Sequence, residues 1–128
     1  MKLFLTSLLL LFIVITSINA QTPALWGTTD NGGQSGGGNL FVTNSTGTNY
    51  KNLYSFQNQD AIPASSVIQA TNGLLYGLTT SGGANNYGMI YSYDITSGGY
   101  TDLHDFTNED GASPLGSLLQ AKDSLLYG

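Results

Sequence analysis

One short sequence pattern recurs three times along this chain of 128 residues. The copies read Leu25-Trp26-Gly27-Thr28-Thr29, Leu75-Tyr76-Gly77-Leu78-Thr79 and Leu126-Tyr127-Gly128, and their glycines are 50 and 51 residues apart. A constant period of this length is typical of proteins that stack one small structural unit several times. The sequence therefore predicts tandem repeats, with repeat 1 at about residues 25–74, repeat 2 at about 75–124 and the start of repeat 3 at 125–128.

Further residues between these anchors recur at the same spacing. They are Gly38-Asn39-Leu40-Phe41 with Gly88-Met89-Ile90-Tyr91, Leu53-Tyr54-Ser55-Phe56 with Leu103-His104-Asp105-Phe106, Asp60 with Asp110 and, after one inserted residue, Pro63 with Pro114. This regularity argues against a disordered chain rich in glycine and asparagine, which is the alternative for such a composition.

The residues within one repeat predict four short antiparallel strands, at about residues 74–79, 89–93, 100–106 and 117–121. Gly98 and Gly99 suit a tight turn between the second and third strands, because glycine adopts positive φ without steric cost. No apolar period of 3.6 residues follows residue 20, so we expect an all-β fold.

Four strands in about 50 residues are typical of a kelch-like β-propeller blade. Such a blade buries its apolar faces against its neighbours around a central channel. The predicted core between blades consists of Leu75, Ile90, Leu103 and Leu119.

The N-terminus has the parts of a secretory signal peptide. Lys2 precedes an apolar run from Leu3 to Ile15, and small polar residues then lead to Ala20. The run is shorter than the roughly 20 apolar residues of a membrane-spanning helix, although a retained membrane anchor is the alternative. We expect an N-terminal signal helix in residues 1–20 that is removed. Residues 21–128 would then be secreted or held at the cell surface, with no membrane insertion after cleavage.

The chain after residue 20 is acidic and has no cysteine. Its two lysines, Lys51 and Lys122, stand against eight acidic residues, which gives a net charge of −6. Binding to nucleic acid depends on lysine and arginine, so we expect neither nucleic acid nor an anionic membrane surface as a partner. Because disulfide bonds are impossible, stability must come from packing and backbone pairing.

The combined motifs resemble a known family. They are Leu75-Tyr76-Gly77-Leu78-Thr79-Thr80-Ser81-Gly82-Gly83, Gly88-Met89-Ile90-Tyr91, Leu103-His104-Asp105-Phe106 and Asp110-Gly111-Ala112-Ser113-Pro114. The pattern is similar to the GloVer tandem repeat over the whole chain after residue 20, although Trp26, Tyr54 and Ala61 depart from it in the first copy. The resemblance implies a secreted bacterial protein with a propeller-like repeat array and a variable C-terminal anchor. It implies no known reaction.

The number of repeats is small for a closed propeller, which typically has 4–8 blades. A chain that stops inside a strand would also leave an unpaired edge. We therefore expect an N-terminal fragment of a longer protein, in which further repeats of the same chain pack on these two. The alternative is a short structural protein that assembles by pairing its open edges.

Two loops contain oxygen ligands of the kind that calcium prefers. Asp60 and Asp110 are repeat equivalents, and Asn108 and Glu109 precede the second of them. The alternative role is local, because Asp and Asn side chains commonly bond to their own backbone in turns. Asp60 and Asp110 are the candidate calcium ligands, and no cofactor is expected.

The other polar residues form no catalytic set. His104 is expected to be a partly buried strand residue, because strand alternation directs it away from Asp105 and its repeat equivalent is Tyr54. Asp102 and Asp105 show no pattern that assigns chemistry to them. Tyr87 lies in a loop and is the aromatic residue least explained by packing, so it is the candidate for binding a ligand such as a sugar.

Together these features favour a secreted or cell-surface β-repeat scaffold whose loops bind a glycan or a protein ligand, without catalysis in this segment. The alternative is the N-terminal part of a secreted propeller enzyme whose catalytic residues lie beyond residue 128. Whether the protein is an enzyme stays open, with a non-enzymatic role favoured.

Overall fold

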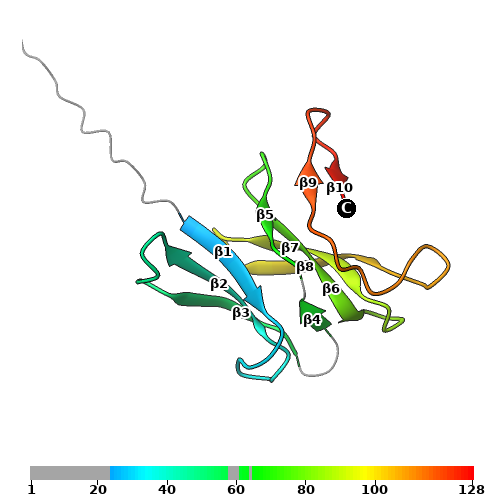
Figure 1. Ribbon diagram of the computed structural model, residues 1–128, viewed down its shortest axis with the longest axis horizontal. Coiled ribbons are helices and arrows are strands. Elements are labelled where there is room, and N and C mark those ends of the chain that lie inside the picture. The colour runs from blue at the N-terminus through cyan, green and yellow to red at the C-terminus, as the bar shows by residue number, and fades with distance from the viewer. Residues whose placement is uncertain (1–23, 58–60, 64) are drawn as a thin grey trace, which may run out of the picture.

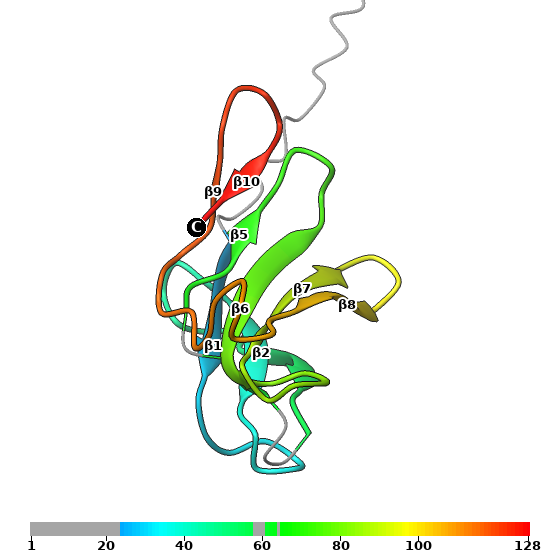
Figure 2. The ribbon, with the colours of Figure 1, turned by 90° about the vertical axis from the view of Figure 1, so that its right-hand side faces the viewer.

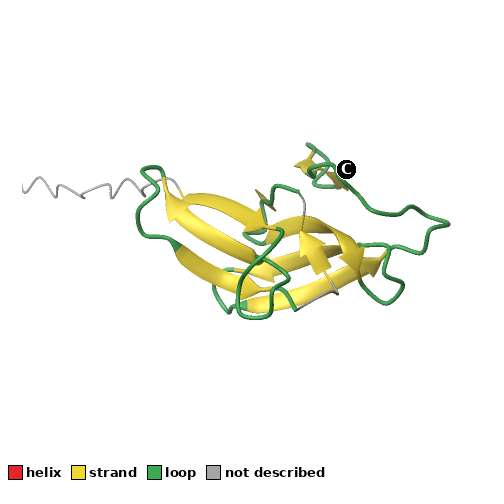
Figure 3. Ribbon diagram, turned by 60° about the horizontal axis from the view of Figure 1, so that its bottom comes forward, coloured by secondary structure: helices red, strands yellow, loops and turns green. Residues whose placement is uncertain are grey.

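The computed structural model describes residues 24–57, 61–63 and 65–128. Within these ranges the chain consists of β-strands, turns and loops without a helix (Figure 3), so the predicted all-β fold is confirmed. Accordingly, the described residues include no helix with the length and apolar character needed to span a membrane. The predicted signal helix in residues 1–20 lies outside the described residues.

Short strands follow one another along the described chain: β1 (Ala24–Thr29), β2 (Asn39–Asn44), β3 (Lys51–Ser55), β4 (Ala61–Pro63), β5 (Ile68–Gln69), β6 (Leu75–Gly82), β7 (Met89–Asp94), β8 (Gly99–Asp105), β9 (Leu119–Gln120) and β10 (Leu126–Tyr127). Sheet 1 has the order β1-β2-β3 (Figure 1). Sheet 2 has the order β4-β6-β7-β8, with β5 also paired to β6, and β9 and β10 form a hairpin. All the pairs are antiparallel.

Sheet 2 and the β9–β10 hairpin each combine strands from two neighbouring sequence repeats, whereas all three strands of sheet 1 belong to repeat 1. Strands β4 and β5 belong to repeat 1 but pair with β6 of repeat 2, and β9 of repeat 2 pairs with β10. The four strands that the sequence predicts within one repeat therefore do not lie in one sheet. The reason is local: a tight turn containing Gly73, whose φ is 85°, joins β5 to β6. Closing so short a loop costs little chain entropy.

Sheets 1 and 2 pack face to face around the core. On sheet 1, Leu40 is fully buried, and Trp26 and Tyr54 pack against the same cluster. Sheet 2 supplies the buried side chains of Leu75, Met89, Tyr91 and Tyr93. Figure 2 shows β1 and β2 beside β6, in agreement with this packing. The core thus lies between one repeat and the next.

The predicted core is only partly correct. Leu75 is buried and Ile90 is half-buried, whereas Leu103 is 50% exposed and Leu119 is 68% exposed. Strand alternation places Ile90 on the face opposite to Tyr91, which is the core side chain of β7. In this structure the face with Ile90 has no complete sheet against it among the described residues.

The β9–β10 hairpin begins to cover that face. It lies beside β5 in both views (Figures 1 and 2), and Gln120 Oε1 accepts a hydrogen bond from the Thr71 amide at 2.9 Å. The hydroxyl groups of Ser66 and Ser117, which are repeat equivalents, are 2.7 Å apart. Leu118 is buried, in place of the predicted Leu119. Consecutive repeats therefore contact one another along the β5 and β9 segments as well.

Candidate functional site

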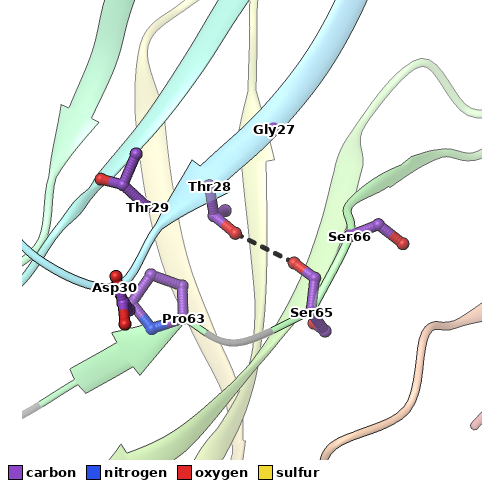
Figure 4. A pocket seen from close by; sticks show the side chains of 7 residues that line it. All are labelled: Gly27, Thr28, Thr29, Asp30, Pro63, Ser65 and Ser66. Atoms are coloured by element: carbon purple, nitrogen blue, oxygen red, sulfur yellow. Dashed lines mark hydrogen bonds between the residues drawn. The ribbon is translucent and has the colours of Figure 1, made fainter.

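A cleft of about 660 Å³ lies along β1 and the segment after β4 (Figure 4). It is lined by Gly27, Thr28, Thr29, Asp30, Pro63, Ser65 and Ser66. The Thr28 hydroxyl donates to the Ser65 carbonyl at 3.0 Å, and the buried Ser65 hydroxyl accepts the Leu78 amide at 3.3 Å. These hydroxyl groups hold the two sheets together, so they are poorly available to a ligand.

A second cavity, of about 460 Å³, opens between β3 of sheet 1 and β8 of sheet 2. We call it the seam cavity, and its lining residues are Tyr54, Phe56, Gln57, Ala61, Gly83, Ala84, Met89, Tyr100, Asp102 and Asp105. The rings of Tyr54 and Tyr100 are stacked, with centroids 4.3 Å apart and planes 4° apart. Phe56 meets Tyr54 edge-on at 5.2 Å. The cavity therefore has a rigid aromatic wall contributed by both repeats.

Two carboxylates face this aromatic wall. Asp102 pairs with Tyr91 and Asp105 pairs with Met89, so both acids lie on the face of β8 that is turned toward sheet 1. Asp105 Oδ1 accepts the Ala84 amide at 3.0 Å. Partial burial, and then the neighbouring charge of Asp105, raise the pKa of the Asp102 carboxyl. Among its described lining residues the cavity contains no lysine or arginine that would balance these charges.

Regular strand alternation does not predict this acid pair. In a regular strand, residues three positions apart point to opposite faces. Here the register shifts between Ile90 and Tyr91, so that Leu103 forms a bulge and Asp102 and Asp105 share a face. The departure of both residues from Asn52 and Ser55, their repeat equivalents, was the available signal.

The predicted ligand-binding residue, Tyr87, lies in the loop between β6 and β7 and is 39% exposed. Its carbonyl accepts the Ser113 amide at 2.8 Å, which joins this loop to the loop after β8. Tyr87 does not line the seam cavity. It is instead part of a separate loop surface, and its role in binding stays a prediction.

Of the candidate calcium ligands, Asp60 lies outside the described residues. Asp110 Oδ1 accepts the Thr107 amide at 2.8 Å, and Oδ2 is 3.0 Å from Nε2 of His104. The Thr107 amide is the main cause of the lowered pKa of Asp110. The bond from the Thr107 amide shows that Asp110 has the local role given as the alternative to calcium binding, in which an Asp side chain bonds to the backbone of its own turn. Within the described ranges, no group of three or more His, Cys, Asp or Glu residues is placed to hold a metal ion, and calcium binding stays a prediction.

His104 lies in β8 and is more exposed than expected, with 47% of its side-chain surface accessible. Its ring meets Phe106 edge-on at 5.2 Å. Tyr54, its repeat equivalent, instead stacks on Tyr100 in the core. On sheet 1 this position, Tyr54, packs against sheet 2. On sheet 2 the same position is His104, which stays exposed.

Comparison with known proteins assigns the chain to a family. A family model described as the Gloeobacter/Verrucomicrobia repeat matches residues 14–128. Neither the curated proteins nor the solved structures give a match. The matched range contains both repeats and the stacked sheets described above. The chain therefore belongs to the Gloeobacter/Verrucomicrobia repeat family, as its motifs indicate.

Proposed function

We propose that this protein is a secreted or cell-surface scaffold of the β-propeller type, whose function is to bind a glycan or a protein ligand. Its repeats would stack around an axis and present loops and seam cavities to the outside. Export would follow from the signal peptide expected in residues 1–20.

The observation that carries the proposal is the way in which the two sheets stack. The core face of sheet 1 contains Leu40 and Tyr54. Their repeat equivalents, Ile90 and His104, are paired directly on the opposite, open face of sheet 2. Sheet 1 packs against sheet 2 through the positions of Leu40 and Tyr54. A following sheet would pack against the same two positions of sheet 2, which are Ile90 and His104. Stacking of this kind can continue from repeat to repeat, which is how propeller blades bury their faces.

The surfaces that would bind a ligand are those between and beyond the strands. The loop with Tyr87 and the loop with Ser113 are joined by a hydrogen bond of 2.8 Å. Pro114 comes close to Gly88 in the same region, where an added Cβ on the glycine would lie 2.9 Å from the proline ring. Loops that a rigid sheet holds in place in this way are common ligand-binding surfaces. The seam cavity adds aromatic rings beside polar groups, which suits sugars.

Glycan and protein arrays test this function. The chain would be exported by a bacterial host with its own N-terminal segment, purified, and probed for binding to arrayed glycans and arrayed extracellular proteins. We expect binding to one class of ligand that is reduced by Tyr87→Ala or by Asp102→Asn. Asp30→Asn, which removes the same charge from the other cleft, is the matched control. A folded chain that binds neither array contradicts the proposal.

A further inference from the structure

We propose that the seam cavity binds a small organic ammonium group, with the carboxylates of Asp102 and Asp105 against its charge and the Tyr54–Tyr100 pair against its carbon groups. This inference names the ligand class of a site within the proposed recognition function and rests on that function. The source of the ammonium group is either a primary amine, as in an amino sugar, or a methylated amine.

The positions of Met89, Asp102 and Asp105 hold different side chains in the two repeats. In sheet 1 the positions hold Asn39, Asn52 and Ser55. Asn39 Oδ1 accepts hydrogen bonds from the Asn52 amide group at 3.0 Å and from the Ser55 hydroxyl at 2.8 Å. The Asn52 amide group also donates to the Ser55 oxygen at 2.9 Å. Repeat 1 thus closes a neutral polar network by itself.

Repeat 2 replaces every member of that network. Met89 stands in place of the asparagine acceptor, and Asp102 and Asp105 stand in place of the two donors. Two acceptors that carry like charges cannot satisfy each other as the amide and hydroxyl do. Partial burial, and then the proximity of Asp105, raise the pKa of the Asp102 carboxyl, as described above. A ligand that donates hydrogen bonds and carries positive charge would relieve this repulsion.

The remaining wall of the seam cavity is largely aromatic. Tyr54 and Phe56 come from one sheet and Tyr100 from the other, and their rings are fixed by mutual packing at 4.3–6.0 Å. Apolar rings beside an acid pair suit an ion whose charge is surrounded by carbon. A bare divalent cation prefers six or more oxygen ligands and binds best to several carboxylates and carbonyls, whereas the side chains lining this cavity offer two carboxylates, the amide of Gln57 and the hydroxyls of Tyr54 and Tyr100. An organic ammonium is therefore the better match.

Nuclear magnetic resonance titration of the exported, purified chain tests the inference. Choline is compared with 3,3-dimethyl-1-butanol, its uncharged isostere, and glucosamine is compared with glucose, all at constant ionic strength. Shifts of the backbone amides of Ala84, Asp102 and Asp105 report on the cavity, because Ala84 donates to Asp105. We expect at least one ammonium compound to bind about tenfold more tightly than its neutral counterpart, the effect of one partly screened ion pair.

The variants Asp102→Asn and Asp105→Asn preserve shape and should each weaken ammonium binding about tenfold. Asp30→Asn removes an equal charge outside the cavity and should leave the affinity unchanged. Thermal unfolding of each variant verifies that it is folded. Choline binding with weak glucosamine binding points to a methylated amine, and the reverse pattern points to an amino sugar.

Three results overturn the inference. Equal binding of charged and neutral compounds would identify an apolar cavity, leaving the recognition function intact. Calcium chloride that shifts the same amides at lower concentration than choline would identify a metal site. A folded chain that binds no ammonium compound refutes the ammonium site alone, whereas failure on the arrays refutes the recognition function.

Discussion

The two repeats place equivalent residues in opposite environments. Leu40 of sheet 1 is fully buried, whereas Ile90, its equivalent in sheet 2, is half-buried. Leu53 packs against the core cluster, whereas Leu103 is 50% exposed. The strands and their pairing are alike in both sheets. On this face, burial therefore depends on whether a following sheet packs against the strands.

The other faces of the two sheets show the reverse difference. An aromatic ring crosses a glycine of the neighbouring strand in both repeats, Phe41 over Gly27 and Tyr91 over Gly77. Tyr91 is completely buried against sheet 1. Phe41 is half-buried, and its ring is tilted against that of the exposed Tyr50, with ring centroids 5.3 Å apart. The same glycine–aromatic pair thus belongs to the core in repeat 2 and to an open surface in repeat 1. Matched substitutions in the two repeats can measure the difference in stability.

The largest difference is expected for Leu40→Ala against Ile90→Ala. Removing the buried Leu40 side chain leaves a cavity and should lower the free energy of unfolding by about 2–5 kcal/mol. Ile90→Ala should cost about 1 kcal/mol, because part of that side chain is already in contact with water. Urea denaturation monitored by circular dichroism measures both. Equal losses would show that the open face of sheet 2 is covered in solution.

The next difference concerns the two glycines. A Cβ added at Gly77 or at Gly27 would lie 2.5 Å from Cζ of Tyr91 or Phe41. Overpacking a filled core typically costs about 1–3 kcal/mol, so Gly77→Ala should approach the upper value. Gly27→Ala should cost less than about 1 kcal/mol, since the half-buried Phe41 ring has room to move. The same denaturation series measures this pair, and a Gly27→Ala loss as large as that of Gly77→Ala would contradict the stated difference in burial.

The aromatic rings themselves allow a gain in stability. The Tyr91 hydroxyl is buried without a hydrogen-bond partner among the described residues, and Phe41 occupies the equivalent position without a hydroxyl. Burying an unsatisfied hydroxyl is unfavourable, so Tyr91→Phe should stabilise the fold by about 1 kcal/mol. Thermal unfolding measures the gain. A loss of stability instead would mean that the hydroxyl has a partner in solution.

The smallest effect is expected at the exposed loop of Asp110. The Thr107 amide lowers the pKa of this carboxyl below its ordinary value of 3.8. A depressed pKa adds stability above pH 3.8 that is lost as the pH falls below that value. Asp110→Asn should therefore flatten the acid dependence of stability in this range. Unfolding curves between pH 2 and 5 measure it, with Glu109→Gln as the control for the lost charge, and an unchanged acid slope would refute the effect.

Much of the fold could be predicted because it depends on local sequence. The recurring Leu-Tyr-Gly and Gly-Gly patterns predicted the strands from β6 to β8 to within a few residues. Which strands share a sheet could not be predicted, because the tight turn at Gly73 pairs β5 of repeat 1 with β6 of repeat 2. Nor could the exposure of Leu103, because it depends on a neighbouring sheet and on a bulge.

The candidate site was less accessible from sequence than the fold. The seam cavity requires Tyr54 of one repeat beside Tyr100 of the next, and no spacing rule states which strands meet across two sheets. The acid pair also depends on the bulge at Leu103, which reverses the alternation for Asp102 and Asp105. A residue-by-residue comparison of the two repeats would have marked these positions, since the neutral set of repeat 1 is replaced there.

The most direct measurement extends the stack by one sheet. Gly128 is the repeat equivalent of Gly77, so residues 78–128 can be fused after Gly128 in register. The chain contains no cysteine, and Ile90→Cys therefore gives a single thiol on the open face of sheet 2, with Ser97→Cys as an exposed control. If repeats stack as sheets 1 and 2 do, residue 90 of the extended chain becomes equivalent to Leu40, which is fully buried. Thiol labelling at position 90 should then slow about tenfold or more, because opening the stack must precede labelling. Equal labelling rates in the original and extended chains would contradict repeat-by-repeat stacking.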